Sequence, residues 1–185
     1  MNRERFYQNE KERRKWQNPE VILTDLGLKP GFTFMDVGCG DGLFAIPAAR
    51  LVGKTGKVYG LDTDDQAVER LKHKALTEGL NNLVLKVGEA EKTVLCEACA
   101  DIVFYGIVLH DFNNPVRVLM NAKKALKPDG RLIDLDWKKK SMELGPPVQI
   151  RFSEDRAIRL IESASFRIET VKAIGPYHYL ITAKS

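Results

Sequence analysis

The chain has 185 residues, of which 44% are hydrophobic and 29% are charged, and its formal net charge is +4. This is the composition of an ordinary globular protein with a core of its own. No apolar run approaches the roughly 20 residues that a membrane-spanning helix needs, and three cysteines are too few for a disulfide scaffold. The charged N-terminus lacks the apolar segment of a signal peptide, so we expect a reducing, cytoplasmic setting and no membrane partner.

Residues 1–17 are mostly charged, and we expect them to form an arm or lid against a single domain that covers residues 18–185. Tyr7 and Trp16 are the aromatic side chains by which this arm would contact a substrate. A frayed extension is the alternative. The basic arm and Lys138–Lys140 could contact phosphate groups. However, a mild charge excess without one long basic block does not favour nucleic acid as a partner.

Helical and extended patterns alternate from Asn18 onward. Asn18 is typical of a helix N-cap and Pro19 of the first helical position, and Gly27 ends that helix. Apolar runs bounded by turn residues predict strands over residues 33–37, 57–61, 83–87, 101–105, 131–135, 166–174 and 178–183. Apolar residues three or four apart predict further helices over residues 43–51, 65–78, 115–126 and 153–164. A turn is expected over residues 128–130 and a loop over residues 138–150.

Strands that alternate with helices favour an α/β fold, with a parallel sheet that is covered by helices on both faces. The crossover connections should be right-handed. The last two predicted strands are separated only by a turn at Gly175 and Pro176. We therefore expect these two strands to pair antiparallel, at one edge of the sheet.

The turn between the first strand and the following helix reads DVGCGDG. Its glycines form a G-x-G-x-G pattern, which lets a ligand approach the backbone closely. The dinucleotide fingerprint would need its third glycine where Leu43 stands, and this difference weakens the hypothesis of a nicotinamide oxidoreductase. The candidate cofactor-binding residues of this turn are Asp36, Gly38, Cys39, Gly40, Asp41 and Gly42.

Acidic residues follow the second and third predicted strands. Asp62, followed by Thr63, stands where an acid can accept hydrogen bonds from both hydroxyls of a ribose. Glu89 could accept from an adenine amino group, and the N–H of Ala90 could donate to a ring nitrogen. Asp62 could instead cap the next helix, and Glu89 could be a solvated loop acid. Because ligands of such sheets bind at the carboxyl ends of the strands, the whole set favours an adenosyl ligand.

With these motifs the chain resembles the class I S-adenosylmethionine-dependent methyltransferases, and most of all the small-molecule branch related to ubiquinone and menaquinone biosynthesis. The glycine motif, Asp62, Glu89 and the segment DIVF at 101–104 carry the resemblance. So does LKPDGRL at 126–132, in which an aspartate replaces the family's usual first glycine. The resemblance implies S-adenosyl-L-methionine as the cofactor and a small-molecule methyl acceptor. It also implies a Rossmann-like seven-stranded sheet in the order 3-2-1-4-5-7-6, with strand 7 antiparallel.

Methyl transfer is an in-line displacement at carbon, which mainly requires alignment of the reactants and exclusion of water. A general base is needed only for an acceptor that arrives protonated. We expect the acceptor after the fourth strand, where Tyr105 and Gly106 would approach the cofactor and His110 is the candidate base. Packing or a structural hydrogen bond is the alternative role of His110. Phe112 and Trp137 are further candidates for the acceptor pocket.

Neither the cysteines nor the acids predict a metal site. Cys96 and Cys99 form a lone C-x-x-C without the second pair or the histidines that a zinc site needs, and we interpret them as ordinary loop thiols. Asp134 and Asp136 could suggest a metal-dependent catechol-type enzyme. However, Asp134 falls within a predicted strand and no matched set of ligands accompanies the pair.

Other functions stay open. An RNA or protein methyltransferase would use the same cofactor and the basic arm. The fourth strand, however, is not followed by the Asn/Asp-Pro-Pro-aromatic motif of amino-methylating nucleic-acid enzymes. A non-catalytic S-adenosylmethionine-binding protein or partner subunit would carry the same site without turnover. A homodimer is compatible with each of these functions.

Overall fold

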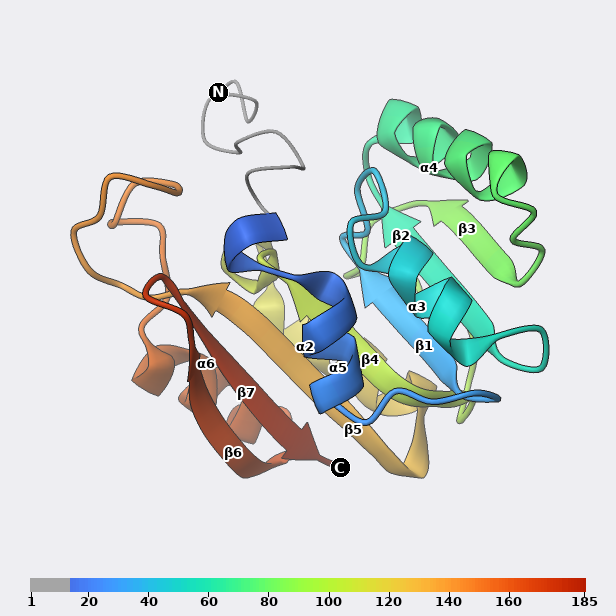
Figure 1. The fold of residues 1–185 in the computed structure, drawn as a ribbon. Coiled ribbons are helices and arrows are strands. Elements are labelled where there is room, and N and C mark those ends of the chain that lie inside the picture. The colour runs from blue at the N-terminus through green and yellow to red at the C-terminus, as the bar shows by residue number, and fades with distance from the viewer. Residues whose placement is uncertain (1–13) are drawn as a thin grey trace.

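The structure is a computed structural model that describes residues 14–185, so Tyr7 and most of the predicted arm lie outside the described residues. Figure 1 shows one twisted sheet with helices on both of its faces. The elements are α2 (Pro19–Asp25), β1 (Thr33–Val37), α3 (Ala45–Val52), β2 (Lys57–Asp62), α4 (Asp65–Thr77), β3 (Leu83–Val87), β4 (Ala100–Gly106), η2 (Leu109–Asp111), α5 (Pro115–Ala125), β5 (Leu126–Trp137), α6 (Glu154–Ser163), β6 (Arg167–Ile174) and β7 (His178–Lys184). Within residues 14–185, no helix combines the length and the apolar character needed to cross a membrane.

The seven strands form one sheet in the order β3-β2-β1-β4-β5-β7-β6. β1 pairs in parallel with β2 and β4, while β2 pairs in parallel with β3 and β4 with β5. β7 pairs antiparallel with both β5 and β6. The predicted strand order and the antiparallel strand are therefore confirmed. The parallel strands end at one edge, which brings the turns after β1, β2 and β3 next to one another.

Most of the helices begin directly after a residue whose side chain caps the first turn. Asn18, Asp64, Asn114 and Ser153 each accept a hydrogen bond from a backbone N–H in the first turn of the following helix. α3 lacks such a cap and begins at Ala45, slightly later than its apolar pattern predicts. Capping side chains thus account for the starts of α2, α4, α5 and α6.

β5 begins at Leu126, earlier than the predicted start at Arg131. Ala100 pairs with Leu126 and Ile102 pairs with Arg131, so residues 127–130 bulge out of the ladder. The proline and glycine of the expected turn therefore lie in a bulge inside the strand. A glycine is required at position 130, because a Cβ there would lie 2.8 Å from the carbonyl oxygen of Ala100.

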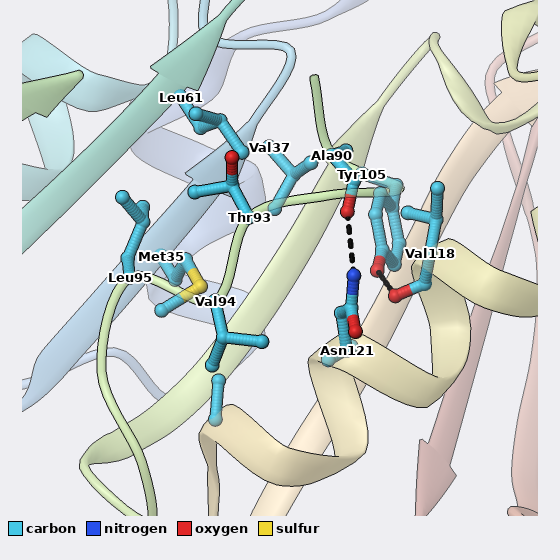
Figure 2. A pocket seen from close by; sticks show the side chains of 12 residues that line it. Met35, Val37, Leu61, Ala90, Thr93, Val94, Leu95, Tyr105, Val118 and Asn121 are labelled. Carbon is cyan, nitrogen blue, oxygen red and sulfur yellow. Dashed lines mark hydrogen bonds between the residues drawn. The ribbon is translucent and has the colours of Figure 1, made fainter. Parts of the chain in front are cut away.

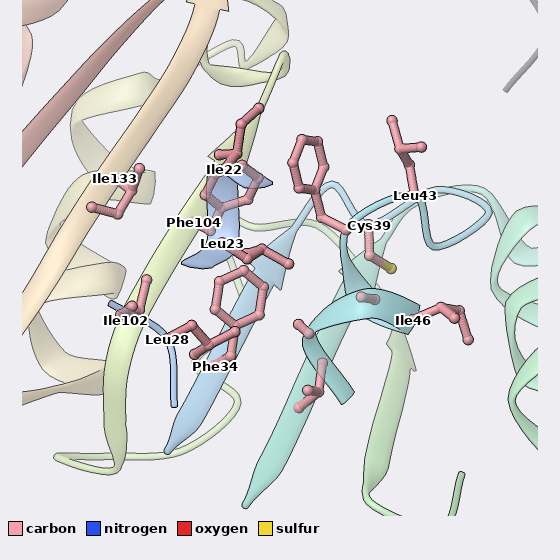
Figure 3. Close-up of a cluster of buried hydrophobic side chains, with 14 of the residues drawn as sticks. Ile22, Leu23, Leu28, Phe34, Cys39, Leu43, Ile46, Ile102, Phe104 and Ile133 are labelled. Carbon is pink, nitrogen blue, oxygen red and sulfur yellow. The ribbon is translucent and has the colours of Figure 1, made fainter. Parts of the chain in front are cut away.

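Apolar side chains cover both faces of the sheet. On one face, α2, α3 and α4 enclose a cluster around Phe34 and Phe104, which Figure 3 shows in close-up. On the opposite face, α5 and α6 enclose a cluster that includes Tyr105, Leu132 and Ile181. Because β4 is buried on both faces, it appears in the sequence as a continuous apolar run over residues 102–105, without polar alternation.

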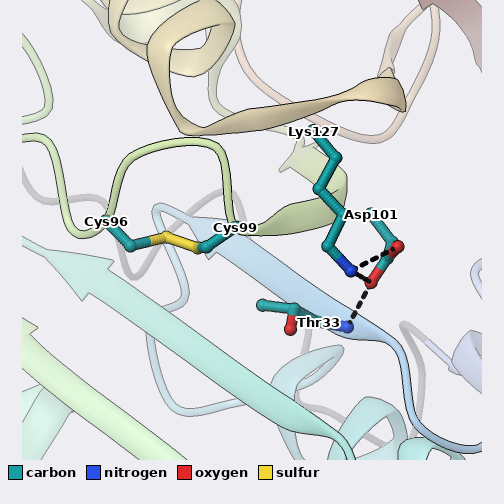
Figure 4. Close-up of a disulfide and its surroundings, with 5 residues drawn as sticks. All are labelled: Thr33, Cys96, Cys99, Asp101 and Lys127. Carbon is teal, nitrogen blue, oxygen red and sulfur yellow. Dashed lines mark hydrogen bonds and ion pairs between the residues drawn. A yellow bond between two sulfur atoms is a disulfide. The ribbon is translucent and has the colours of Figure 1, made fainter.

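Cys96 and Cys99 are joined by a disulfide, shown in Figure 4, so the interpretation of these residues as ordinary loop thiols is wrong. The chain turns sharply between them, because Ala98 has a φ of 46°. The N–H groups of Ala98 and Cys99 donate to the carbonyl oxygens of Lys124 and Ala125, which holds this turn against the end of α5. The two cysteine Cα atoms lie 6.0 Å apart, within the span of a disulfide. Spacing alone does not reveal such a turn.

We expect Phe104→Ala to lower the free energy of unfolding by about 3–5 kcal/mol, because it removes a fully buried ring and leaves a cavity beside Phe34 and Phe44. Val171→Ala is the matched control. Val171 lies on the edge strand β6 and is 44% exposed, so its loss should cost at most about 0.5 kcal/mol. Urea unfolding followed by circular dichroism measures both variants. Equal losses would contradict this position of the core.

Candidate functional site

A cavity of about 210 Å³ lies where β1, β2 and β3 end, and we call it the strand-end cavity. Its wall is formed by the turns after these strands and by the segment after β4. The sequence-predicted residues in this wall are Gly38, Asp62, Thr63, Glu89, Ala90 and Phe112. Residues from four separate segments of the chain therefore meet at one cavity, at the edge of the sheet where the sequence places a ligand.

Two glycines of the turn after β1 are required by packing. Gly38 has a φ of +79°, and a Cβ at this position would lie 2.7 Å from Cγ2 of Val108. Gly42 has a φ of +87°, and a Cβ there would collide with the side chain of Leu71 on α4. Gly40, between them, has no heavy atom within 4 Å of a Cβ position. The G-x-G-x-G pattern thus lets the segment after β4 and helix α4 approach the turn.

The backbone N–H groups of this turn already have partners. Those of Gly38 and Cys39 both donate to the carbonyl oxygen of Leu61, at 2.7 and 3.1 Å. That of Gly40 donates to Oδ2 of Asp62 at 2.8 Å. A loop that binds a pyrophosphate uses its N–H groups to hold phosphate oxygens. The turn therefore fits a cofactor without phosphate groups better than a dinucleotide.

Asp62 joins the ends of β1 and β2. Its Oδ2 accepts from the N–H of Gly40 and its Oδ1 accepts from the N–H of Asp64, at 2.8 and 3.0 Å. Each carboxylate oxygen has a second lone pair, which is available to a ribose hydroxyl. The capping of α4 falls to Asp64, whose side chain accepts from the N–H of Ala67 at 3.0 Å. Asp62 is therefore not the cap of that helix.

The segment after β3 carries the predicted adenine contacts. The carboxylate of Glu89 is exposed and pairs with Lys92 at 2.8 Å, while Ala90 is buried. Asn121, a residue of α5 that the sequence did not single out, donates to the carbonyl oxygens of Ala90 and Glu91 at 2.8 and 3.1 Å. A side chain of α5 thereby holds this segment at the rim of the cavity.

His110 lies in η2 with its side chain fully buried. Its Nδ1 lies 2.8 Å from both carboxylate oxygens of Asp136, and it donates to them because an ionised carboxylate only accepts. Among the described residues, Nε2 has no hydrogen-bond partner, and it lies 3.6 Å from Oδ1 of Asp111, which lines the cavity. Burial lowers the pKa of His110, but the hydrogen bond and the charge of Asp136 outweigh burial, so the pKa is raised. The pair has the arrangement of a base oriented by a carboxylate.

The sequence suggests Asp136 only as a metal ligand and does not indicate that it is the hydrogen-bond partner of His110. The signal that could have found this role is a pair of acids, Asp134 and Asp136, two residues apart and therefore on one face of the otherwise apolar stretch over residues 132–137. Burial and the charge of Asp136 raise the pKa of Asp134 well above its usual range. The part of the chain that the structure describes holds no group of three or more histidine, cysteine or acidic side chains that could bind a metal ion.

Other predicted site residues lie away from the cavity wall. Asp41 is exposed and forms an ion pair with an arginine of α4. Tyr105 is fully buried on the α5 side of the sheet, and its hydroxyl donates to a backbone carbonyl of that helix. Trp137 is buried in the cluster on the opposite face, next to His178. The side chains of these three residues do not line the cavity. They could affect binding only through backbone contacts or by positioning neighbouring residues.

The remaining predicted residues lie at the ends of strands or beyond them. Asp36 and Cys39 are buried, and Gly106 ends β4. Burial and the nearby charges of Asp36 and Asp62 raise the pKa of the Cys39 thiol, so it stays protonated. Trp16 is 37% exposed and packs edge-on against Tyr177, with 4.9 Å between the ring centroids.

Comparison with known proteins identifies the family. The family model described as "Methyltransferase domain" matches residues 28–164. The chain belongs to this family. The solved structure of a SAM-dependent methyltransferase from Aquifex aeolicus superposes on the methyltransferase domain with a TM-score of 0.88 and 32% identity, covering 92% of this chain and 91% of that one. The resemblance stated from the glycine motif and the strand-end acids is confirmed.

Two curated relatives have named activities. The methyltransferase domain is 30% identical over 115 residues to demethylmenaquinone methyltransferase of Staphylococcus aureus, covering 62% of this chain and 47% of the relative. It is 42% identical over 71 residues to a probable cobalt-precorrin-6B C(15)-methyltransferase (decarboxylating) of Saccharolobus solfataricus, covering 38% of this chain and 36% of the relative. In both cases the match spans less than half of the relative's length.

We expect Gly38→Ala to lower the free energy of unfolding by about 2–4 kcal/mol, because it adds a close contact with Val108 to an unfavourable positive φ. Gly40→Ala is the matched control, with positive φ but open space around its Cβ, and should cost about 1 kcal/mol. Urea unfolding measures both variants. Val108→Ala in the Gly38→Ala background should restore part of the loss, and a strictly additive double variant would contradict the contact.

We expect the ring of His110 to titrate above the ordinary histidine value of about 6.5, and to titrate below it in Asp136→Asn, where burial becomes the main influence. Because the folded-state pKa is raised, the stability that this pairing adds is fully present below about pH 6.5 and is lost as the pH rises through the folded pKa. NMR of the histidine ring carbons follows the titration. Asp129→Asn, at an exposed position in the β5 bulge, should leave it unchanged.

Proposed function

We propose that this methyltransferase domain transfers a methyl group from S-adenosyl-L-methionine to a small-molecule acceptor. The strand-end cavity carries the proposal, because it combines Asp62 and Glu89 on neighbouring turns with a glycine turn whose N–H groups need no phosphate. An adenosyl group in this cavity would direct its ribose toward Asp62 and its adenine toward Glu89 and Ala90. The names of the two curated relatives, which refer to demethylmenaquinone and cobalt-precorrin-6B, support a small molecule as the class of acceptor.

When bound, the cofactor supplies a sulfonium-linked methyl group, which passes to a nucleophile as the carbon–sulfur bond breaks. The turns at the strand ends would hold the reactants in line and exclude water. For an acceptor that arrives protonated, Nε2 of His110 would take the proton, because Nδ1 is engaged by Asp136 and Nε2 is directed away from that carboxylate. Asp136 would then stabilise the imidazolium that forms.

The loop after β5 supports the proposal of a cover on the acceptor side. Arg151 is buried and donates to the carbonyl oxygens of Lys140, Leu144 and Pro146, which gathers residues 138–150 into a compact loop. The next residue, Phe152, packs edge-on against the ring of His110, with 6.5 Å between centroids. This loop and the N-terminal arm, residues 1–17, are the proposed lids of a domain that covers residues 18–185. A cytoplasmic setting and a homodimer stay predictions.

We expect Asp62→Asn to weaken the binding of S-adenosylmethionine by about 10- to 100-fold, because an amide retains only one oxygen to accept from the two ribose hydroxyls and from the N–H groups of Gly40 and Asp64. Isothermal titration calorimetry measures the affinity. Asp129→Asn, which changes an exposed acid far along the chain from the cavity, is the control. An unchanged affinity in Asp62→Asn would rule out the ribose role.

The proposed activity itself is tested with methyl-labelled S-adenosylmethionine and a panel of small phenols, quinols, carboxylates and amines. Transfer to a member of this panel, lost in His110→Gln for acceptors that carry a proton, supports the proposal. Transfer only to RNA or protein, with binding that falls steeply as salt rises, would favour the alternative acceptors. Cofactor binding without transfer to any acceptor would favour a non-catalytic partner protein.

A further inference from the structure

Asn121 is a buried amide in a helix face that is otherwise apolar. It is 8% exposed and lies on α5 among Val118, Ala122 and Ala125, which pack against the sheet. A buried amide is costly unless it is hydrogen-bonded. Its amide nitrogen donates out of the helix to two carbonyl oxygens of the segment after β3, those of Ala90 and Glu91. Because these carbonyls only accept, the amide nitrogen must face them.

The segment that Asn121 contacts is held at its start by the bond from the Gly88 N–H to the carbonyl oxygen of Asp62, and at its end by the bonds from Ala98 and Cys99 to the end of α5. Residues 88–99 contain no helix or strand in the structure. A small cavity of about 20 Å³ lies beneath the segment, lined by Thr93, Val94 and Leu95 together with Asn121 and its neighbours, as Figure 2 shows. Apolar packing is therefore incomplete under this segment. The bond from Asn121 to Ala90, drawn in Figure 2, fixes it from the side of α5.

The two carbonyls that Asn121 contacts belong to the wall of the strand-end cavity. Ala90 and Glu91 line that cavity, as does Glu89 immediately before them. A displacement of the Ala90 or Glu91 backbone would shift both the Glu89 carboxylate and the Ala90 N–H, because they share one short stretch of chain. Asn121 itself does not line the strand-end cavity, so any effect on the cofactor has to pass through this segment.

We propose that Asn121 is a positioning residue for the adenine end of the cofactor, and that it determines both how tightly the base is bound and how well its amino group is distinguished from a carbonyl. This inference rests on the proposed function, since it needs an adenosyl ligand in the strand-end cavity. A site that accepts a hydrogen bond from an exocyclic amino group discriminates against the carbonyl analogue only if the acceptor is held in place. At Ala90 and Glu91, the helix α5 provides that constraint through the side chain of Asn121.

The test compares Asn121→Leu with Asn82→Leu, and S-adenosylhomocysteine serves as the adenosyl probe. Asn82 is a matched control, because its amide also donates to two backbone carbonyls, those of Ala49 and Gly53, at 2.8 and 2.9 Å, but near the start of β3 and away from the cavity. Both variants lose two hydrogen bonds of the same kind. Leucine has the same branching and the same number of side-chain heavy atoms as asparagine but is larger, so Asn121→Ala serves as a second variant if the first does not fold.

Calorimetry should show that the wild-type chain prefers S-adenosylhomocysteine over S-inosylhomocysteine, in which a carbonyl replaces the amino group. Asn121→Leu should bind S-adenosylhomocysteine about 10-fold more weakly and should lose most of that preference. Asn82→Leu should retain both the affinity and the preference, even if its melting temperature falls by a similar amount. Loss of affinity with an unchanged preference, or no change in either, would overturn the inference. A wild-type chain that binds neither ligand would instead contradict the proposed function.

Discussion

A single carbonyl oxygen links the ends of β1 and β2, the two neighbouring strands at the site. The oxygen of Leu61, at the end of β2, accepts the N–H groups of both Gly38 and Cys39, immediately after β1. These two bonds follow directly after the last pair of the parallel ladder, Val37 and Leu61, and Gly38 turns the chain there with a φ of +79°. The same turn brings the N–H of Gly40 to the carboxylate of Asp62. The cavity at this edge depends on that geometry, because it sets the position of the turn relative to the acid that follows β2.

The rest of the site is held in place by one contact from helix α5 and one from strand β5. Asn121 ties the segment after β3 to α5, and Asp136 of β5 orients His110 after β4. Both contacts join residues that are far apart in the sequence, and both place a hydrogen bond in surroundings with little water. Such bonds contribute more to positioning than exposed ones do, since leaving either partner unpaired would cost the full desolvation of that group. The residues around the cavity are therefore held by a few hydrogen bonds between distant parts of the chain.

Residue patterns with a local cause were predictable. Helix starts follow from capping residues such as Asn18 and Ser153, and the strand order follows from the alternation of elements together with the family resemblance. Patterns that depend on distant partners were not. The bulge in β5 depends on the strand opposite it, and the Cys96–Cys99 disulfide depends on a turn held against the end of α5. The burial of Tyr105 and Trp137 on opposite sides of the sheet depends on which way each strand faces.

The amino-acid sequence by itself determined the class of fold, the strand-end acids and the absence of a third fingerprint glycine, because these are properties of residue type and spacing along one segment. Only the tertiary structure decided that Asp64 caps α4, so that Asp62 is not needed as a cap and can serve a ligand. It also decided that His110 has a carboxylate partner and that an amide of α5 holds the segment after β3, which lines the cavity. These assignments require knowing which atoms meet across the sheet, and a hydrogen bond between distant residues leaves no periodic signal in the chain.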